Sequence, residues 1–295
     1  MKLVNNVLYS LVKRNLKKFL RDRAAVFFSF LSVIIILLLY ILFLGKMQID
    51  SVKAEIGDIN GIGWLVSSWI MSGILMVSTV TVPLSAIGGL IDDRADNILD
   101  DFYVSPISRN KLALSYLISS WVIGFILVFV NLIIGQIYVI SQGGEMLSLF
   151  TFIKMLLLVL FSIMTFSSFF FYFSTIIKTR NAFGTLSTLV GTFIGFLGGI
   201  YIPIGVLGKS VQTVMNVLPT AHAVTIFRRV YMQGAVNEVF ANAPEGAYEA
   251  YADTFGLRIV IGSFEMQEWH MLLSMGIFMT IFYVLSIIKL SKNKL

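Results

Sequence analysis

The 295-residue chain contains no cysteine and only two histidines. A chain without cysteine forms no disulfide, no thiolate metal site and no cysteine nucleophile. The two histidines, His222 and His270, lie far apart in the sequence, so their spacing does not indicate a metal site. Metal-dependent and thiol redox chemistry are therefore disfavoured, and we expect no bound metal and no catalytic residue.

Charged residues are also scarce. Asp, Glu, Lys and Arg make up 13% of the chain, against about 25% in ordinary soluble domains. Hydrophobic residues make up 57%, and the mean hydropathy is +0.88. This composition excludes an ordinary soluble globular protein and is typical of a multi-pass membrane protein.

The few charges divide the sequence into six long uncharged runs. About 20 apolar residues cross the hydrocarbon core of a bilayer as one helix. Each run is long enough for one such helix and too short for two. We therefore predict an all-α polytopic membrane protein with six transmembrane helices, at about 24–45, 62–91, 112–140, 155–177, 182–203 and 269–288.

The formal net charge is +6, which by itself could indicate a nucleic-acid partner. The positive charges instead gather on alternate loops, because 1–23, 92–111, 178–180 and 289–295 contain 15 of the 22 Lys and Arg residues. Cytoplasmic loops of membrane proteins carry such an excess. The distribution predicts that both chain ends are cytoplasmic and that the partner is the lipid bilayer, not nucleic acid.

Residues 1–23 combine apolar and basic side chains in a helical pattern. Leu8, Leu11, Leu16 and Phe19 share one side, and lysines and arginines mostly occupy the other. This pattern predicts a cytoplasmic amphipathic helix that lies parallel to the membrane surface. The alternative is a basic flank that only fixes the topology.

The cytoplasmic segment 92–111 is acidic, which breaks the positive-inside trend. Its carboxylates accompany apolar residues, so the segment is either a solvated turn or a docking element for a soluble partner. A metal cluster is disfavoured because no histidine is nearby and Arg94 lies among the carboxylates. The candidate docking residues are Asp92, Asp93, Asp96, Ile98, Leu99, Asp100, Asp101 and Phe102.

The region 208–268 is the only sizeable part outside the predicted spans, and we expect it to form an external cap of short helices. Within it, 210–227 has no charge but contains Gln212, Asn216 and Pro219. These residues make a poor membrane span, so we expect a membrane-surface or re-entrant segment that returns to the external side.

The predicted spans contain no Asp, Glu, Lys or Arg. Ion-coupled transporters normally keep ionisable residues at membrane depth, and membrane enzymes need a paired acid and base or metal ligands. An ion-coupled carrier or a membrane enzyme is therefore the less favoured class, and energy for any transport should come from another source.

The fifth predicted span is rich in glycine and ends in Gly198, Gly199 and Pro203, which predicts a broken helix. Glycines on one face allow another helix to approach closely. This face is either a moving interface beside a translocation pathway or a surface of simple close packing. The residues concerned are Gly191, Gly195, Gly198, Gly199, Pro203, Phe193 and Phe196.

Three stretches, taken in order, resemble the permease subunits of ABC-2 type transporters. The first is the basic amphipathic entry 11–22, which is similar to the connecting helix of that family. The second is 98–109, with its Ser105-Pro106 step before the third span. The third is 198–203, followed by the proline-headed segment at 216–221 and by Arg228. The approach to the second stretch, 92–99, departs from the usual pattern of the family.

The resemblance implies the fold of ABC-2 (type V ABC) exporters over nearly the whole chain and assigns 92–111 to the coupling loop that contacts an ATPase. The chain has no phosphate-binding loop of its own, so it is not expected to be an enzyme. ATP and Mg should bind a separate cytosolic ABC ATPase, present in two copies. A second permease copy or a homologue should complete the assembly.

The expected function is ATP-driven export of an amphipathic or hydrophobic cargo, such as a drug, a peptide antibiotic or a lipid-like molecule. Within the same fold, export of lipid-linked polysaccharide or teichoic acid is the alternative. A role in multidrug or antimicrobial resistance and a place in the cell membrane of a prokaryote fit the first function. The sequence leaves open the cargo and the choice between homodimer and heterodimer.

Overall fold

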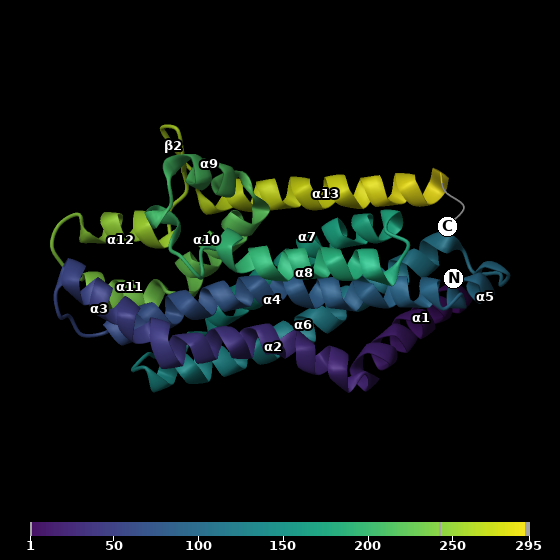
Figure 1. Cartoon of the computed structure of the whole chain (residues 1–295), viewed down its shortest axis with the longest axis horizontal. Helices are drawn as coiled ribbons and strands as arrows, with labels where there is room; N and C mark the ends of the chain where they lie inside the picture. Colours follow the sequence, from purple (N-terminus) through teal and green to yellow (C-terminus); the bar gives the residue numbers. More distant parts are fainter. Residues whose placement is uncertain (1, 242, 293–295) are drawn as a thin grey trace.

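The structure is a computed structural model that describes residues 2–241 and 243–292, and these residues form a bundle of long helices (Figure 1). Residue 1 and residues 293–295, which the sequence assigns to the two cytoplasmic ends, lie outside the described residues. Within the described part, five helical segments are long and apolar enough to cross a membrane: Arg23–Ala54, Ile62–Ala95, Arg109–Ser141, Leu149–Ile176 and Glu268–Leu290. The prediction of an all-helical membrane protein is confirmed.

The chain begins with α1 (Lys2–Arg21), which packs against α6 (Arg109–Ser141). Asp22 separates α1 from α2 (Arg23–Leu39), because its carboxylate accepts a hydrogen bond from the Ala25 backbone amide at 2.9 Å and caps the new helix. A π-helical turn, Tyr40–Leu44, joins α2 to α3 (Gly45–Ile56) without a loop. The first long helix therefore extends well beyond the predicted end at 45.

The centre of the bundle is α4 (Ile62–Ala95), most of whose residues are buried. It contacts α6, α7 (Leu149–Ile176) and α8 (Arg180–Leu197). Small residues allow these close contacts, since Gly124 of α6 packs against Pro83 of α4 and Ile163 of α7. The buried Asn131 of α6 also donates from Nδ2 to the Ser78 hydroxyl at 3.0 Å, which adds a polar contact between α6 and α4.

The helix α8 runs antiparallel to α4. Its first turn lies near the end of α4, where Gly88 contacts Phe183, and its last residues lie near the middle, where Met76 contacts Gly198. The span predicted for 182–203 thus begins at 180 and stops at 197, because Gly199 takes a left-handed conformation with φ +60°. Its glycines, threonines and polar start make α8 less apolar than the five segments above.

After a single 3-10 turn (Ile204–Val206), α9 (Lys209–Val217) and α10 (Pro219–Tyr231) form a helical hairpin. The tip of this hairpin, at Leu218 and Pro219, shares a cavity with Val80 in the middle of α4. From there α10 returns until Arg228 lies over the Trp69 ring, near the start of α4. The hairpin therefore enters the bundle and leaves it on the same side.

The remaining elements of the cap are α11 (Gln233–Phe240), α12 (Ala247–Phe255) and a two-stranded antiparallel hairpin of β1 (Val260–Ile261) and β2 (Phe264–Glu265). The last helix, α13 (Glu268–Lys292), runs beside α7. Figure 1 shows α3, α11 and α12 at one end of the bundle, here called the cap end. It shows α1 and α5 (Ile98–Tyr103) at the other, here called the base.

Candidate coupling surface and translocation face

The short helix α5 protrudes at the base (Figure 1). Asn97 begins it in the left-handed conformation (φ 58°), which turns the chain sharply away from α4. Leu99 is buried and anchors the helix to the bundle, whereas Asp100 and Asp101 are exposed. Val104, just beyond the helix, is 88% exposed. This combination of two carboxylates and an apolar tip can contact a soluble partner through both charge and apolar area.

Behind α5, the carboxylate of Asp93 is completely buried (0% exposed). It accepts hydrogen bonds from Arg14 Nη1 at 2.5 Å, from Lys18 Nζ at 2.6 Å and from the Tyr116 hydroxyl at 2.5 Å. These partners come from α1 and α6, so one carboxylate ties both helices to the end of α4. The Arg14 guanidinium also lies over the Phe102 ring, 5.4 Å from its centre. This Asp93 cluster links α1 directly to α5.

A second set of ion pairs surrounds the end of α4. Arg180, at the start of α8, donates to Asp92 at 3.0 Å and to Asp96 at 2.5 Å. Arg94 donates to the backbone carbonyls of Ser174 and Ile177 at the end of α7. Residues 92–96 therefore connect α4 to α1, α6, α7 and α8 at one level of the bundle.

The structure thus divides the eight candidate docking residues into two groups. Asp100 and Asp101 are exposed, and Ile98 and Phe102 are partly exposed, so these four can reach a partner together. The other four face the bundle or hold its helices together. Leu99 is buried, and the carboxylates of Asp92, Asp93 and Asp96 each form an ion pair with an arginine of another helix.

The candidate translocation residues also fall into two groups, one on α8 and one in the break that follows it. On α8, Gly191, Phe193 and Phe196 are exposed, whereas Gly195 is buried against the Tyr201 ring. A Cβ at Gly195 would overlap that ring, so the glycine is required by the close approach. The remaining three belong to the break that follows α8: Gly198, Gly199 and Pro203.

Phe193 is part of an apolar cavity of about 320 Å³ between α7, α8, α10 and α13. Aromatic and aliphatic side chains dominate its wall, and Thr220 at the hairpin tip contributes the hydroxyl group. Its lining residues include Val80, Phe166, Phe169, Leu197, Pro219 and Phe278. Such a cavity can accept an apolar group but offers almost no hydrogen-bonding partners.

On the cap side of this cavity, a buried arginine fixes the break that follows α8. Arg228 of α10 is 1% exposed, and its Nη2 donates to the carbonyl oxygens of Gly198 at 3.1 Å and Gly199 at 3.0 Å. Its guanidinium stacks 4.7 Å from the centre of the Trp69 ring. The Tyr40 hydroxyl donates to the next carbonyl, that of Ile200, at 2.5 Å. We call these contacts the Arg228 cluster.

Sequence reasoning did not find the partners of these carboxylates and carbonyls. Arg14 and Lys18 are spaced four residues apart on one face of α1, which is a detectable signal for a shared acidic partner. No pattern in the sequence could indicate Arg180, Tyr116 or Tyr40, because their partners lie far away in the chain. Among the described residues, no group of three or more His, Asp or Glu could hold a metal ion.

Comparison with known proteins agrees with this architecture. The model of one protein family, described as ABC-2 type transporter, matches residues 6–232 of the chain. No curated protein matches. The matched region includes most of α1, the helix α5 at the base, the glycine-rich α8 and the helical hairpin through Tyr231. Because the match covers most of the chain, this protein belongs to the ABC-2 type transporter family.

Proposed function

We propose that this ABC-2 permease exports an amphipathic or hydrophobic cargo, with energy supplied by a separate ATPase. The membrane domain of the family is a permease subunit and is not itself an ATPase. The observation that carries the cargo class is the apolar cavity beside Phe193, on the glycine-rich helix α8. A lipid-like or drug-like molecule gains free energy when its apolar surface leaves water for such a wall, at roughly 25 cal/mol per Å² buried.

We infer that α8 is a sixth membrane-crossing helix. The helices α4, α7 and α13 run from the cap end to the base, whereas α2 and α6 run the opposite way. Since α7 ends at the base and α13 starts at the cap end, the chain between them must cross once more. The antiparallel contact of α8 with α4 supports this crossing, and the hairpin of α9 and α10 then re-enters from the cap side.

With six crossings, both chain ends lie on one side, and the positive-inside pattern makes that side cytoplasmic. The base with α5 then faces the cytosolic ABC ATPase, and the cap faces the exterior of what we take to be a prokaryotic cell membrane. In this arrangement Asp100, Asp101 and Phe102 contact the ATPase together with Val104. The ion pairs of Asp92, Asp93 and Asp96 transmit its movement to α1 and α8.

We further infer that the permease works with a second copy or a homologue, and that two ATPase subunits serve the pair. The exposed apolar residues of α2 and the exposed, glycine-containing face of α8 support this, because each offers a surface on which another helix can pack. Each of the two permease subunits would then contribute its own Phe193 to the pathway.

Two steps test the proposed function. The first is purification of the detergent-solubilised chain from native membranes, with identification of any P-loop ATPase that accompanies it. The second is ATP-dependent uptake of a fluorescent amphipathic dye by inside-out vesicles that contain both subunits. Export predicts dye accumulation that stops when ATP is replaced by a non-hydrolysable analogue. No accumulation by an intact complex would refute an amphipathic cargo and favour a polysaccharide substrate.

The chain has no cysteine, so a single introduced cysteine reports on one position. Phe193→Cys, labelled with an environment-sensitive dye, should respond to cargo in a saturable manner. Thr188→Cys, on the exposed part of α8 outside the cavity, is the matched control and should not respond. An equal response at both positions would place the cargo in the surrounding lipid and not in the cavity.

A further inference from the structure

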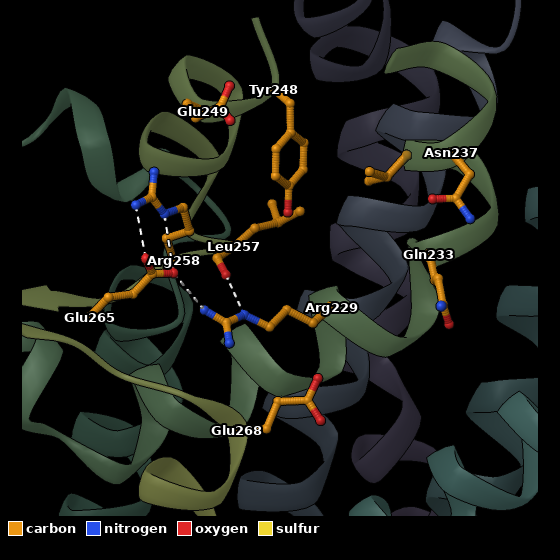
Figure 2. A pocket seen from close by; sticks show the side chains of 10 residues that line it. Arg229, Gln233, Asn237, Tyr248, Glu249, Leu257, Arg258, Glu265 and Glu268 are labelled. Carbon is orange, nitrogen blue, oxygen red and sulfur yellow. Dashed lines mark hydrogen bonds and ion pairs between the residues drawn. The ribbon is translucent and has the colours of Figure 1, made fainter. Parts of the chain in front are cut away.

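The cap contains a second cavity, of about 520 Å³, that opens at the surface (Figure 2). Its walls come from α10, α11, α12, the hairpin and the start of α13. Of its lining residues, only Arg229 lies within the region matched by the family, which ends at residue 232. This cap cavity therefore lies almost entirely outside the matched region, and its lining shares no residue with that of the apolar cavity beside α8.

Two arginines hold the wall of the cap cavity in place. Arg229 donates to the carbonyl oxygens of Leu257 at 2.6 Å and of Met266 at 3.4 Å. Arg258 donates to both carboxylate oxygens of Glu265, at 3.2 and 2.9 Å (Figure 2). The bidentate contact lowers the pKa of Glu265 below its usual value, so this carboxylate stays ionised. Asp253 lies 3.5 Å from Arg258 as well, and Arg229 lies 3.7 Å from Glu265, so both arginines already face carboxylates of the chain.

Among the groups of the wall with unused hydrogen-bonding capacity, the charged acceptors are the carboxylates of Glu249 and Glu268, whereas the amides of Gln233 and Asn237 offer both donors and acceptors. The Glu249 carboxylate has no side-chain hydrogen bond or ion pair within the described ranges 2–241 and 243–292, although it attracts Arg258 electrostatically. Glu268 has one contact, with Lys154 Nζ at 3.3 Å. Figure 2 shows Gln233 and Asn237 on the opposite wall, with the Tyr248 hydroxyl pointing toward the centre. Carboxylates, amide oxygens and a phenol together favour a ligand that brings positive charge and N–H donors.

The volume of the cavity and the apolar parts of its wall restrict the class of ligand further. Binding sites of small molecules have volumes of about 300–1,000 Å³, a range that includes this cavity. Leu257, Val236 and the Tyr248 ring also line it and can pack against methylene groups. The contact of the Lys154 ammonium with Glu268 provides an internal example, since here an alkylammonium already binds at the edge of the cavity.

We propose that the cap cavity binds a cationic, amine-bearing molecule with a short alkyl chain from the external side. Glu249 and Glu268 would bind its ammonium groups, and Gln233 and Asn237 would accept further hydrogen bonds. This site is independent of the proposed export, because a ligand can occupy the cap cavity without passing through the bundle.

The test uses the full chain in nanodiscs of uncharged phospholipid, without ATP or ATPase, and spermidine as the probe in isothermal titration. We expect saturable binding that weakens at least tenfold in the double variant E249Q/E268Q. The matched control is E245Q, an equal loss of charge on an exposed cap residue outside the cavity, which should bind as the wild type does. Thermal unfolding of each variant checks that the cap remains folded.

A further variant sharpens the result. Lys154→Met removes the cation that now contacts Glu268 and should strengthen spermidine binding several-fold, because the carboxylate becomes fully available. Three outcomes would overturn the proposal: no saturable binding, tighter binding of the dianion glutarate than of spermidine, or unchanged spermidine affinity in a folded E249Q/E268Q variant. Since none of these depends on transport, failure here leaves the export function standing.

Discussion

At the scale of single residues, the buried carboxylate of Asp93 holds together the helices at the base of the bundle. Its two cationic partners are only partly buried, with exposures of 31% for Arg14 and 40% for Lys18. When the carboxylate is lost, both cations can turn toward water, which moderates the penalty of an uncompensated charge.

Asp93→Asn should therefore destabilise the folded permease by about 1–3 kcal/mol. It should also release α1 from α4 and α6. Thermal unfolding in detergent and the rate of proteolysis within 2–21 measure these two effects. Asp101→Asn is the control, because that exposed carboxylate has no such partner within the part of the chain that the structure describes, and its loss should change stability by less than about 0.5 kcal/mol. Equal stability of the two variants would show that the Asp93 cluster does not hold the base together.

Arg228 has a comparable role beside the break in α8. Replacement by Met preserves the apolar stem but leaves the carbonyl groups of Gly198 and Gly199 without their donor. Hydrogen exchange of a peptide that covers 198–208 should become faster in Arg228→Met than in wild type. Lys209→Met, on the exposed cap surface, should leave the exchange unchanged. Unaltered protection in Arg228→Met would mean that the Tyr40 contact alone fixes this segment.

At the scale of elements, two glycines of α8 differ in their surroundings although both lie on the same helix. Gly195→Ala should displace the Tyr201 ring and destabilise the fold by about 1–3 kcal/mol, as overpacking does. Gly191→Ala meets open space and should be neutral or stabilising by up to about 1 kcal/mol, because alanine favours helix. Thermal unfolding of both variants checks this, and an identical effect would show that α8 does not pack as described.

The helix α5 supports a functional prediction of its own. Reversal of both exposed charges, Asp100→Lys with Asp101→Lys, should uncouple ATP hydrolysis from export while the spans stay folded. Dye uptake by vesicles and ATP hydrolysis by the same complex are measured together. The control places the same charge reversal on the cap, as Glu238→Lys with Glu245→Lys. ATP-dependent uptake that survives the α5 reversal unchanged would refute contact of this helix with the ATPase.

At the scale of the whole molecule, six crossings place α1 and the end of α13 on the same side, whereas five would place them on opposite sides. Single cysteines at Lys13 and Lys289 should both resist a membrane-impermeant maleimide added to intact cells. A cysteine at Ser263, in the hairpin of the cap, should react. Reaction of the Lys289→Cys variant with the external reagent would exclude α8 as a crossing helix.

Much of this architecture could be predicted from the sequence, since charge-free runs and loop charges follow from the cost of burying ions in lipid. The basic entry 11–22, the Ser-Pro step and the glycine-proline break with the segment after it together supported the resemblance that the family match confirms. The pairing of Asp93 with Arg14 and Lys18, or of Arg228 with two carbonyls, could not be predicted. These contacts join residues about 30 to 80 positions apart, and no local pattern encodes such a distance.

The length of α4 has a mechanical consequence. Its 34 residues form a rod of about 50 Å at 1.5 Å per residue. The ion pairs of 92–96 attach four neighbouring helices at one end of this rod, and the Trp69 ring under Arg228 lies near the other. Rotation of the rod by about 5° around its base would move the far end by about 4 Å. A displacement of this size exceeds the 3.0 and 3.1 Å lengths of the Arg228 hydrogen bonds, so the contact of α5 with an ATPase proposed above would need only a small rotation of α4 to alter the Arg228 cluster.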